Sequence, residues 1–336
     1  MPPLQILDCM KTAFRISLVI LSIFLLYSCK KDKGAPPVLT TSEVTAITIS
    51  SAVSGGTVTD DPTSILSKGI CYSTEQNPTT LDNKTVDNSI TYSFLDGMTG
   101  LSANTTYFVR AFATNSSGTG YGNQVKFTTL MDYTGQTGTV DDVDGNSYPT
   151  IGIGSQIWMA KNLVTTKFQD GTPIPLVTSN TLWASATAAF CYYNNSLQNK
   201  TIYGGLYNFY TIDATYNGYK NVCPAGWHVP SDMEFVTLIL YLGEISAAKK
   251  LKETGTLHWK NQNSGTNTSG FSALPGGVRY DTNGAFDAIG YDALFWSSTS
   301  YGADNANKMI ISGDGATAWD GSNKRYGFSI RCLKDL

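Results

Sequence analysis

The sequence is poor in charge, in histidine and in long apolar runs. Charged residues make up 15% of the 336 residues and the net charge is −3, so the chain offers no basic surface for a nucleic-acid backbone. Two histidines leave few candidates for an imidazole base or a metal site. Hydrophobic residues (41%) and aromatic residues (12%) are abundant, which argues against disorder. With 32 glycines and 19 tyrosines, the composition is typical of a turn-rich, mostly β protein of about two domains.

The longest apolar run lies near the N-terminus, at residues 16–26. It follows the basic residues Lys11 and Arg15, and as a helix it would reach roughly 16 Å, about half of a bilayer's hydrocarbon core. This length is typical of the apolar region of a signal peptide. Because residues 1–9 contain no basic side chain, both Met1 and Met10 are candidate starts.

The run ends in residues 26–29 (LYSC), which resemble a bacterial lipobox, the signal for lipidation of its cysteine. The resemblance implies a signal peptide over residues 1–28, a lipid on Cys29 and a tether over residues 29–37. Processing would leave 336 − 28 = 308 residues, held at a membrane by lipid. We therefore expect an outer-membrane lipoprotein at the cell surface. The alternatives are the periplasmic face and an uncleaved membrane anchor.

Residues 38–130 alternate strand-like runs with turn clusters, as expected for a sandwich of antiparallel sheets. Residues 101–107 (LSANTTY) resemble the tyrosine corner of fibronectin type III domains, with Ala103 in place of proline. The resemblance implies that the Tyr107 hydroxyl bonds back to the preceding loop. We expect this domain to be a spacer, in which Cys71 is a small buried apolar residue.

After a linker at residues 131–138, a domain over residues 139–336 contains six motifs in a fixed order. They are IGIGSQIWMAKNL (151–163), YGGLYN (203–208), CPAGWHVPS (223–231), GFSALPGG (270–277), FWSST (295–299) and GFSIRC (327–332). This succession resembles the Fibrobacter succinogenes major paralogous domain, which is found on secreted and surface lipoproteins of Bacteroidota.

The layout of that family, a single helical stretch followed by irregular β-structure, is similar to C-type lectin-like folds, including sulfatase-modifying factors. The whole chain is therefore expected to be mostly β with a smaller α+β part. A fibronectin type III-like β-sandwich would be followed by a C-type lectin-like α+β domain.

A helix is predicted to begin at Ser231, because Ser231 and Glu234 have the spacing of a capping box. The residues that follow form an apolar stripe at helical spacing: Phe235, Leu238, Ile239 and Leu242. Gly243 is predicted to end this helix, and a second helix is predicted over residues 245–252. From Thr256 onward, the Gly- and Asn-rich chain indicates a long loop region between short strands.

The cysteines show no C-x-x-C spacing, so zinc-binding and thioredoxin-like sites have no support. In the fold that the resemblance implies, the helix start and the last strand lie together, which predicts a disulfide between Cys223 and Cys332. It would close a loop of about 110 residues. Pairing of Cys191 with Cys223 is the alternative.

An acidic cluster lies around an Asp-Gly turn: Asp141, Asp142, Asp144 and Asn146. Its oxygens are suited to Ca²⁺, but an EF-hand loop starting at Asp142 would need an acid at its twelfth position, which is Ile153. We therefore favour a hairpin turn on Asp144-Gly145 and predict no metal site and no cofactor.

The best ligand-site candidates are Asp314, Trp319 and Asp320, in a glycine-rich loop at residues 313–323. An aromatic face with planar polar side chains is suited to sugars. The proline triplets of calcium-dependent lectins are absent, and Trp319-Asp320 matches only a fragment of their second motif. A plain surface loop is the alternative.

No catalytic residue is predicted. His228 and His258 lie thirty residues apart, outside any nucleophile or metal motif. Cys332 is alone near the C-terminus, whereas sulfatase-modifying enzymes use a cysteine pair there, so their activity is not implied. We expect non-catalytic binding or adhesion, with polysaccharide or cell-envelope proteins as partners. The alternatives are a structural cell-envelope or protein–protein interaction module and, third, an enzyme of unknown chemistry.

Overall fold

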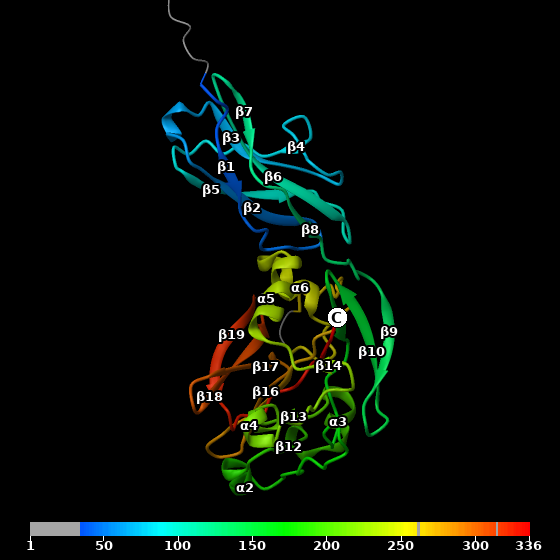
Figure 1. Cartoon of the computed structure of the whole chain (residues 1–336). Coiled ribbons are helices and arrows are strands. Elements are labelled where there is room, and N and C mark those ends of the chain that lie inside the picture. The colour runs from blue at the N-terminus through cyan, green and yellow to red at the C-terminus, as the bar shows by residue number, and fades with distance from the viewer. Residues whose placement is uncertain (1–33, 261–262, 314) are drawn as a thin grey trace, which may run out of the picture. The chain divides into compact units, whose positions relative to one another are not determined.

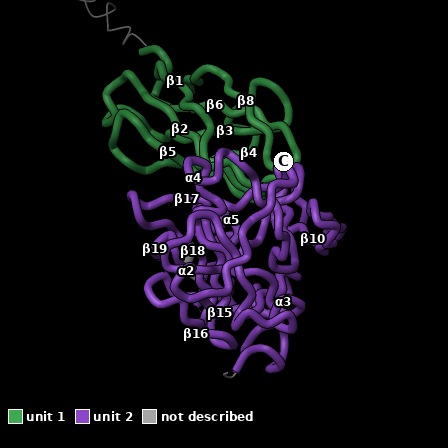
Figure 2. Tube along the Cα trace, turned by 90° about the horizontal axis from the view of Figure 1, so that it is seen from below, with its two compact units in different colours: residues 1–130 green, residues 131–336 purple. Residues whose placement is uncertain are grey.

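The computed structural model describes residues 34–260, 263–313 and 315–336. The predicted signal peptide, Cys29 and Asp314 lie outside the described residues. The chain divides into two compact units, residues 1–130 and 131–336 (Figure 2). Within the described part, no helix is both long and apolar enough to cross a membrane.

The first unit contains two antiparallel sheets (Figure 1). One sheet has the order β1–β2–β5, formed by β1 (Leu39–Thr41), β2 (Ser51–Val58) and β5 (Ser93–Thr99). The other has the order β4–β3–β6–β7, with β8 also paired to β6, and is formed by β4 (Asn83–Lys84), β3 (Ser67–Ser73), β6 (Thr106–Asn115), β7 (Gly118–Tyr121) and β8 (Val125–Thr128). A short 3₁₀ helix, η1 (Pro62–Ser64), precedes β3.

The tyrosine corner forms as predicted. The Tyr107 hydroxyl accepts a hydrogen bond from the Ser102 amide at 3.0 Å, and the Tyr107 ring stacks on Phe127 with centroids 5.8 Å apart. Cys71 is fully buried, and burial raises the pKa of its thiol to about 11, so the thiol stays protonated and inert.

The chain enters and leaves the first unit at opposite ends of β6. The Asn115 side-chain amide, at the end of β6, donates to the carbonyl of Ala35 at 2.9 Å. The backbone amide of Asn104, just before β6, donates to the carbonyl of Leu130 at 3.0 Å. Because β6 has ten residues, these two ends are separated by roughly 30 Å.

The second unit is built from several small sheets rather than one large one. A five-stranded sheet has the order β14–β20–β11–β10–β9, from β9 (Thr137–Asp141), β10 (Ser147–Ile153), β11 (Gln156–Met159), β14 (Trp227–His228) and β20 (Leu333–Lys334). A three-stranded sheet consists of β17 (Asp292–Tyr301), β18 (Asn305–Ser312) and β19 (Gly315–Asn323). Two pairs complete the set: β12 (Phe190–Cys191) with β13 (Leu206–Tyr207), and β15 (Gly276–Arg279) with β16 (Phe286–Ile289).

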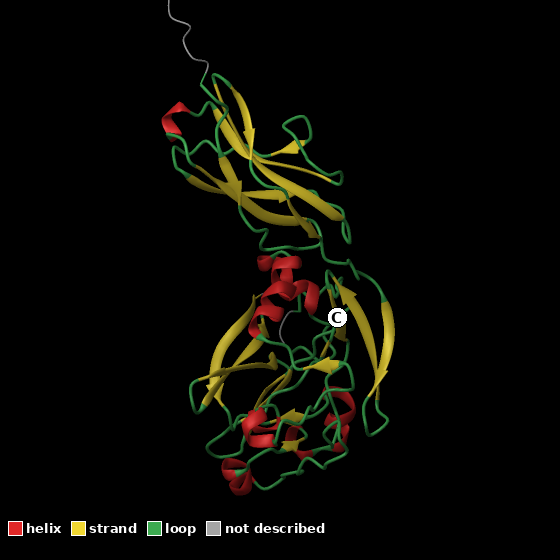
Figure 3. Ribbon diagram, in the orientation of Figure 1, coloured by secondary structure: helices red, strands yellow, loops and turns green. Residues whose placement is uncertain are grey.

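The helices of the second unit are short (Figure 3). The α-helices are α2 (Asn180–Ser185), α3 (Leu197–Tyr203), α4 (Ala214–Asn217), α5 (Asp232–Tyr241) and α6 (Ala247–Leu251). The 3₁₀ helices are η2 (Tyr193–Asn195), η3 (Phe209–Thr211) and η4 (Glu244–Ser246). The expected single helical stretch is therefore wrong, because α2 to α4 precede it. These helices have four to seven residues, too few for an apolar periodicity to show in the sequence.

The longest helix, α5, begins at the predicted capping box, where a Glu234 carboxylate oxygen accepts from the Ser231 amide at 2.7 Å. Phe235 and Leu238 are fully buried on its inner face. Gly243, with φ of 81°, follows the helix. The predicted second helix is divided into η4 and α6.

One expectation about the C-terminal part is wrong. Residues 315–323, expected to lie in a loop, form strand β19, which pairs with β18 and packs against α5 and α6. The strand was not expected because the glycines, alanines and polar residues of β19 show no strand-like hydrophobic alternation. Pairing with β18 therefore determines the structure of this segment.

A buried arginine joins three of the sequence motifs. Arg331 is fully buried and donates to Asn162 Oδ1 (2.9 Å), to the carbonyls of Met159 (3.3 Å) and Ser272 (2.9 Å), and to the carbonyl of Phe271. Burial lowers its pKa to about 9, so it remains charged at neutral pH. The motifs around residues 159, 271 and 331 are thus fastened to one guanidinium.

Candidate functional site

Cys223 and Cys332 form a disulfide, the predicted pairing, with Cα atoms 5.9 Å apart. It joins the segment before β14 to the segment before β20, and these two strands also pair with each other. Cys191 is a free buried thiol, and burial raises its pKa to about 12.

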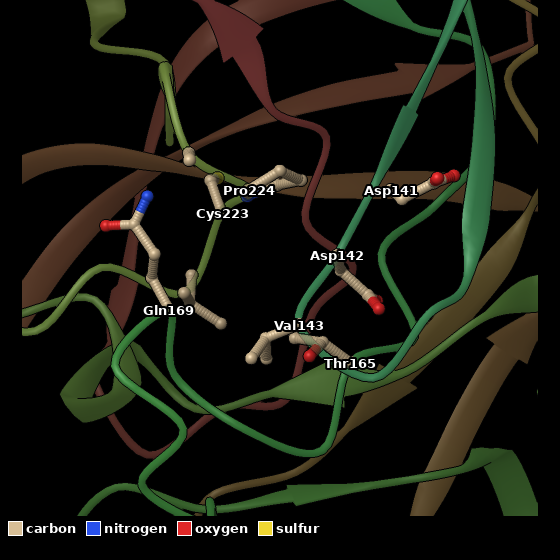
Figure 4. A pocket seen from close by; sticks show the side chains of 9 residues that line it. Asp141, Asp142, Val143, Thr165, Gln169, Cys223 and Pro224 are labelled. Carbon is tan, nitrogen blue, oxygen red and sulfur yellow. The ribbon is translucent and has the colours of Figure 1, made fainter.

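A pocket of about 240 Å³ lies beside Cys223 (Figure 4). Three segments line it: the end of β9 with the following turn, a loop at residues 165–169, and residues 222–225. The lining residues are Asp141, Asp142, Val143, Thr165, Gln169, Val222, Cys223, Pro224 and Ala225.

Asp142 is held by the turn between β9 and β10 and by Tyr148 of β10. Its Oδ1 accepts from the amides of Asp144 and Asn146, both at 2.9 Å. Its Oδ2 accepts from the Asn146 side-chain amide at 2.8 Å and from the Tyr148 hydroxyl at 2.5 Å. A carboxylate offers about four lone-pair positions, so Asp142 has none left for a ligand.

The neighbouring Asp144 is also engaged. It accepts from the Thr166 amide at 2.6 Å and lies 3.0 Å from the Lys167 ammonium. Partial burial raises the pKa of Asp144, but the hydrogen bonds from Thr166 and Lys167 outweigh it and hold the pKa at about 2. Gly145, with φ of 81°, completes the hairpin turn that the sequence favoured. Within the described ranges, no group of three or more His, Cys, Asp or Glu is placed to hold a metal ion.

Two polar side chains of the pocket have no such engagement. Asp141 and Gln169 are exposed, and neither side chain has a hydrogen-bond partner among the described residues. The Thr165 hydroxyl, by contrast, donates to the Lys167 carbonyl at 3.0 Å. Figure 4 shows the Asp141 and Gln169 side chains on opposite sides of the pocket, with the Asp141 carboxylate turned away from the space that Val143, Cys223 and Pro224 surround.

His228 lies between two carboxylates. Its Nδ1 is 2.5 Å from Asp335 Oδ1 and its Nε2 is 2.9 Å from Glu234 Oε1. Because ionised carboxylates only accept, this arrangement favours the imidazolium form, in which both ring nitrogens donate. The hydrogen bond with Glu234 raises the pKa of His228, against the opposing effect of burial.

Ser231 does not convert this group into a nucleophile–base pair. Its hydroxyl donates to Glu234 Oε2 at 2.7 Å, not to a histidine nitrogen. Burial raises the pKa of Glu234, but the hydrogen bonds from His228 and Ser231 lower it to about 2. The cluster therefore holds the start of α5 to the C-terminal segment. His258 contacts a single carboxylate, with its Nδ1 2.8 Å from Glu253 Oε2.

Of the sequence-predicted ligand residues, Asp320 can be placed with its side chain, and it does not line the pocket. Asp320 lies on β19 and is exposed, with its carboxylate 2.5 Å from the Lys308 ammonium. Lys308 also donates to the Ser322 hydroxyl at 2.8 Å. Trp319 is placed on β19 by its backbone. Sequence reasoning missed Gln169, because no motif marks a loop residue that only the fold brings to the same pocket as Cys223.

Residues 151–334, more than half of the chain, match the family model of the Fibrobacter succinogenes major domain. The chain belongs to this family. The matched range of the Fibrobacter succinogenes major domain begins within β10, so it contains Gln169 and Cys223 but not Asp141. The pocket is thus formed by both the family domain and the strand that precedes the match.

No curated protein matches this chain. Among solved structures, it is similar to the sensor domain, in its short form, of the anti-sigma factor RsgI4 of Pseudobacteroides cellulosolvens, at 18% identity over 29% of this chain and 97% of that chain, with a TM-score of 0.23. It is also similar to the third fibronectin III domain of human KIAA0343 protein, at 14% identity over 33% of this chain and 96% of that chain, with a TM-score of 0.22.

Proposed function

We propose that this protein is a lipid-anchored outer-membrane protein that acts in non-catalytic binding or adhesion at the cell surface, with polysaccharide as the first ligand class. The lipid on Cys29 is supported by the basic residues, the apolar run and the LYSC ending of the N-terminal segment.

The first unit is proposed to be a spacer. The chain enters beside Asn115 and leaves beside Asn104, at the two ends of β6. A unit of this kind adds roughly 30 Å to the distance between its N-terminal anchor and whatever follows. A domain with both ends on one side would add little.

The observation that supports a binding role is that the histidine and carboxylates that could act in catalysis already have hydrogen-bond or ion-pair partners within the protein. His228 lies between Glu234 and Asp335, which raises its pKa and favours the protonated ring, a form that cannot accept a proton as a general base. The carboxylates of Asp142 and Asp144 are occupied by backbone amides, a tyrosine and a lysine. What is left for recognition is the exposed polar surface and the pocket.

Replacement of Cys29 tests the anchor. With Cys29→Ala, the protein should leave the membrane fraction, and protease treatment of intact cells should degrade the wild type if it is at the cell surface. Unchanged membrane association of the variant would contradict lipidation. Protection of the wild type in intact cells, with cleavage after outer-membrane permeabilisation, would indicate the periplasmic face.

A glycan array tests the ligand class, using the chain from residue 34 to residue 336. Binding that is lost in Trp319→Ala and retained in Tyr219→Ala, an exposed aromatic residue elsewhere in the second unit, would support a site on β19. Silence across the array would contradict polysaccharide binding and favour a protein–protein interaction module.

A further inference from the structure

We propose that one end of the first unit lies on the membrane surface, with the side chains of Leu66 and Ile90 inserted among the lipid headgroups. The proposal rests on the lipid at Cys29 proposed above, and it adds a second membrane contact, made by side chains of the folded unit. Three observations support it: where the loops of the first unit lie, which side chains they expose, and how short the chain is between the lipid and the unit.

Several loops lie together at the end of the first unit where the chain enters (Figure 1). The end of β2 pairs with the starts of β1 and β5, and the start of β3 pairs with the end of β6. The Lys68 ammonium of β3 donates to the Thr91 carbonyl, just before β5, at 2.6 Å, so the two sheets share this end of the unit. We call it the entry end, and its loops are residues 59–66, 85–92 and 116–117.

The entry end exposes large apolar side chains. Leu66 is 73% exposed and Ile90 is 76% exposed. Together with Val86 they line one hollow of about 140 Å³, so the three form a single patch drawn from two loops. Val38 and Tyr92, at the same end, are also more than half exposed. Exposed apolar residues that occur singly are ordinary, whereas a group at one end of a domain indicates a contact surface.

The charged groups of the entry end do not oppose contact with lipid. The Lys68 ammonium is buried and lies 3.3 Å from the Asp87 carboxylate, so these two charges compensate each other. Asp60 and Asp61 each accept a hydrogen bond from a backbone amide. Their negative charge would be repelled by anionic headgroups, but three lysines in the tether, within residues 30–33, offset this repulsion.

The length of the tether favours lipid as the partner of this patch. Residues 29–33 separate the lipid on Cys29 from Gly34, the first described residue, and five residues span at most roughly 17 Å when fully extended. Gly34 lies beside Ser117 in the turn between β6 and β7, which belongs to the entry end. The entry end is therefore always close to the membrane. A second copy or a soluble partner would have to compete with a lipid surface that is already within reach.

This contact would give the first unit a defined direction. A tether alone would allow the unit to lie on its side, with β6 parallel to the membrane. With the entry end on the lipid, the point where the chain leaves, beside Asn104, is at the far end of β6. Because β6 has ten residues, that point is then roughly 30 Å from the membrane surface.

The first test measures the depth of residue 90 in the membrane. The lipidated full chain with Ile90→Cys is labelled with an environment-sensitive fluorophore and reconstituted into vesicles of phosphatidylethanolamine and phosphatidylglycerol. Cys71 and Cys191, the free thiols among the described residues, are fully buried, so the label attaches at position 90. Spin labels on the upper part of the lipid acyl chains should quench its emission. An unquenched label in the lipidated chain would overturn the proposal.

The matched control is Leu81→Cys with the same label. Leu81 is 96% exposed and lies between β3 and β4, near the end of β3 that is remote from the entry end, since Asn83 of β4 pairs with Tyr72. The emission of this label should not change with the spin labels. Equal quenching at positions 81 and 90 would overturn the proposal, because the unit would then lie on its side.

Variants without the lipid measure the contribution of the patch alone. In a Cys29→Ala background, Leu66→Ser/Ile90→Ser should weaken partition into the same vesicles, measured by sedimentation, at least about tenfold, because two apolar side chains are removed from the contact. Leu81→Ser removes an exposed leucine elsewhere in the unit and should leave partition unchanged. Equal partition of the three chains would overturn the proposal. Unchanged thermal unfolding by circular dichroism shows that each variant is folded.

These measurements separate the patch from the anchor. Mass spectrometry of the purified chain detects the lipid on Cys29, and its absence would contradict the anchor, while the partition of the Cys29→Ala chains would still decide whether the patch binds lipid. Emission of the label at position 90 that rises with protein concentration in the Cys29→Ala chain, without vesicles, would assign the patch to a second copy and overturn the lipid contact.

Discussion

Removal of the Cys223–Cys332 disulfide should destabilise the second unit alone. The two cysteines are 109 residues apart, and chain entropy for a loop of this length corresponds to about 4–5 kcal/mol at 25 °C. The perturbation is the double replacement Cys223→Ala/Cys332→Ala. The second unit spans 206 residues, from 131 to 336, and at this size 1 kcal/mol moves the melting temperature by about 2–4 °C. We therefore expect a decrease of roughly 10–20 °C.

The distribution of tryptophan makes the assay specific. All six tryptophans lie in the second unit, at positions 158, 183, 227, 259, 296 and 319. Tryptophan fluorescence therefore follows only that unit during urea or thermal unfolding. Circular dichroism at a strand-sensitive wavelength reports both units, so the first unit serves as the control within the same molecule.

The result that would refute this reasoning is a tryptophan transition that moves by less than about 1 kcal/mol in the double variant. A simultaneous shift of the first unit's transition would also refute it, because that unit contains neither cysteine. Reduction of the wild-type protein should give the same loss only after unfolding. Both cysteines are at most 1% exposed, so a reductant has little access to the folded form.

Three further predictions concern hydrogen bonds that fix each unit. Tyr107→Phe leaves the Ser102 amide without its partner and should cost the first unit about 1–2 kcal/mol by circular dichroism, without moving the tryptophan transition. Arg331→Lys keeps the charge but loses the planar fork of donors, and should cost the second unit at least about 2 kcal/mol in urea unfolding; wild-type stability would contradict its role as a fastener. His228→Gln should lower the urea midpoint most between pH about 4.5 and 6.5. The pKa of His228 is raised in the folded protein, so the stabilisation from His228 is complete below pH 6.5 and is lost as the pH rises through the folded pKa. The pKa of Glu234 is lowered to about 2, so the stabilisation from Glu234 is lost as the pH falls from 4.5 toward about 2. A difference from wild type that does not change with pH would exclude this account.

Features that depend on a few residues at fixed spacing could be predicted from the sequence. The capping box at Ser231 and Glu234 and the tyrosine corner at Tyr107 are local, since each bond joins residues three to five positions apart. The Cys223–Cys332 pair was predicted through the family resemblance. Nothing in the residues between them indicates which cysteines meet.

Features that depend on pairing between distant segments could not be predicted. Strand β19 is held by its register with β18, from Asn305 opposite Asn323 to Ser312 opposite Gly315, and not by its own β-propensity. The pocket combines the end of β9 with two loops that follow at different points of the chain. Asp141 was noted in the sequence only as a member of an acidic cluster, and its separation from the engaged Asp142 is visible only in the hydrogen bonds of the turn.

The buried charges of the second unit indicate how a domain of small sheets is held together. Arg279 is fully buried and donates to the carbonyls of Val177 and Thr178, as Arg331 does to Phe271 and Ser272. Most of the acceptors are backbone carbonyls, which every residue type supplies, and each arginine adds one asparagine side chain, Asn180 for Arg279 and Asn162 for Arg331. The arginines therefore fix the path of these loops largely through the loop backbone. A scaffold of this kind leaves loop side chains available for recognition while the fold is maintained from within, which is the arrangement that a binding domain requires.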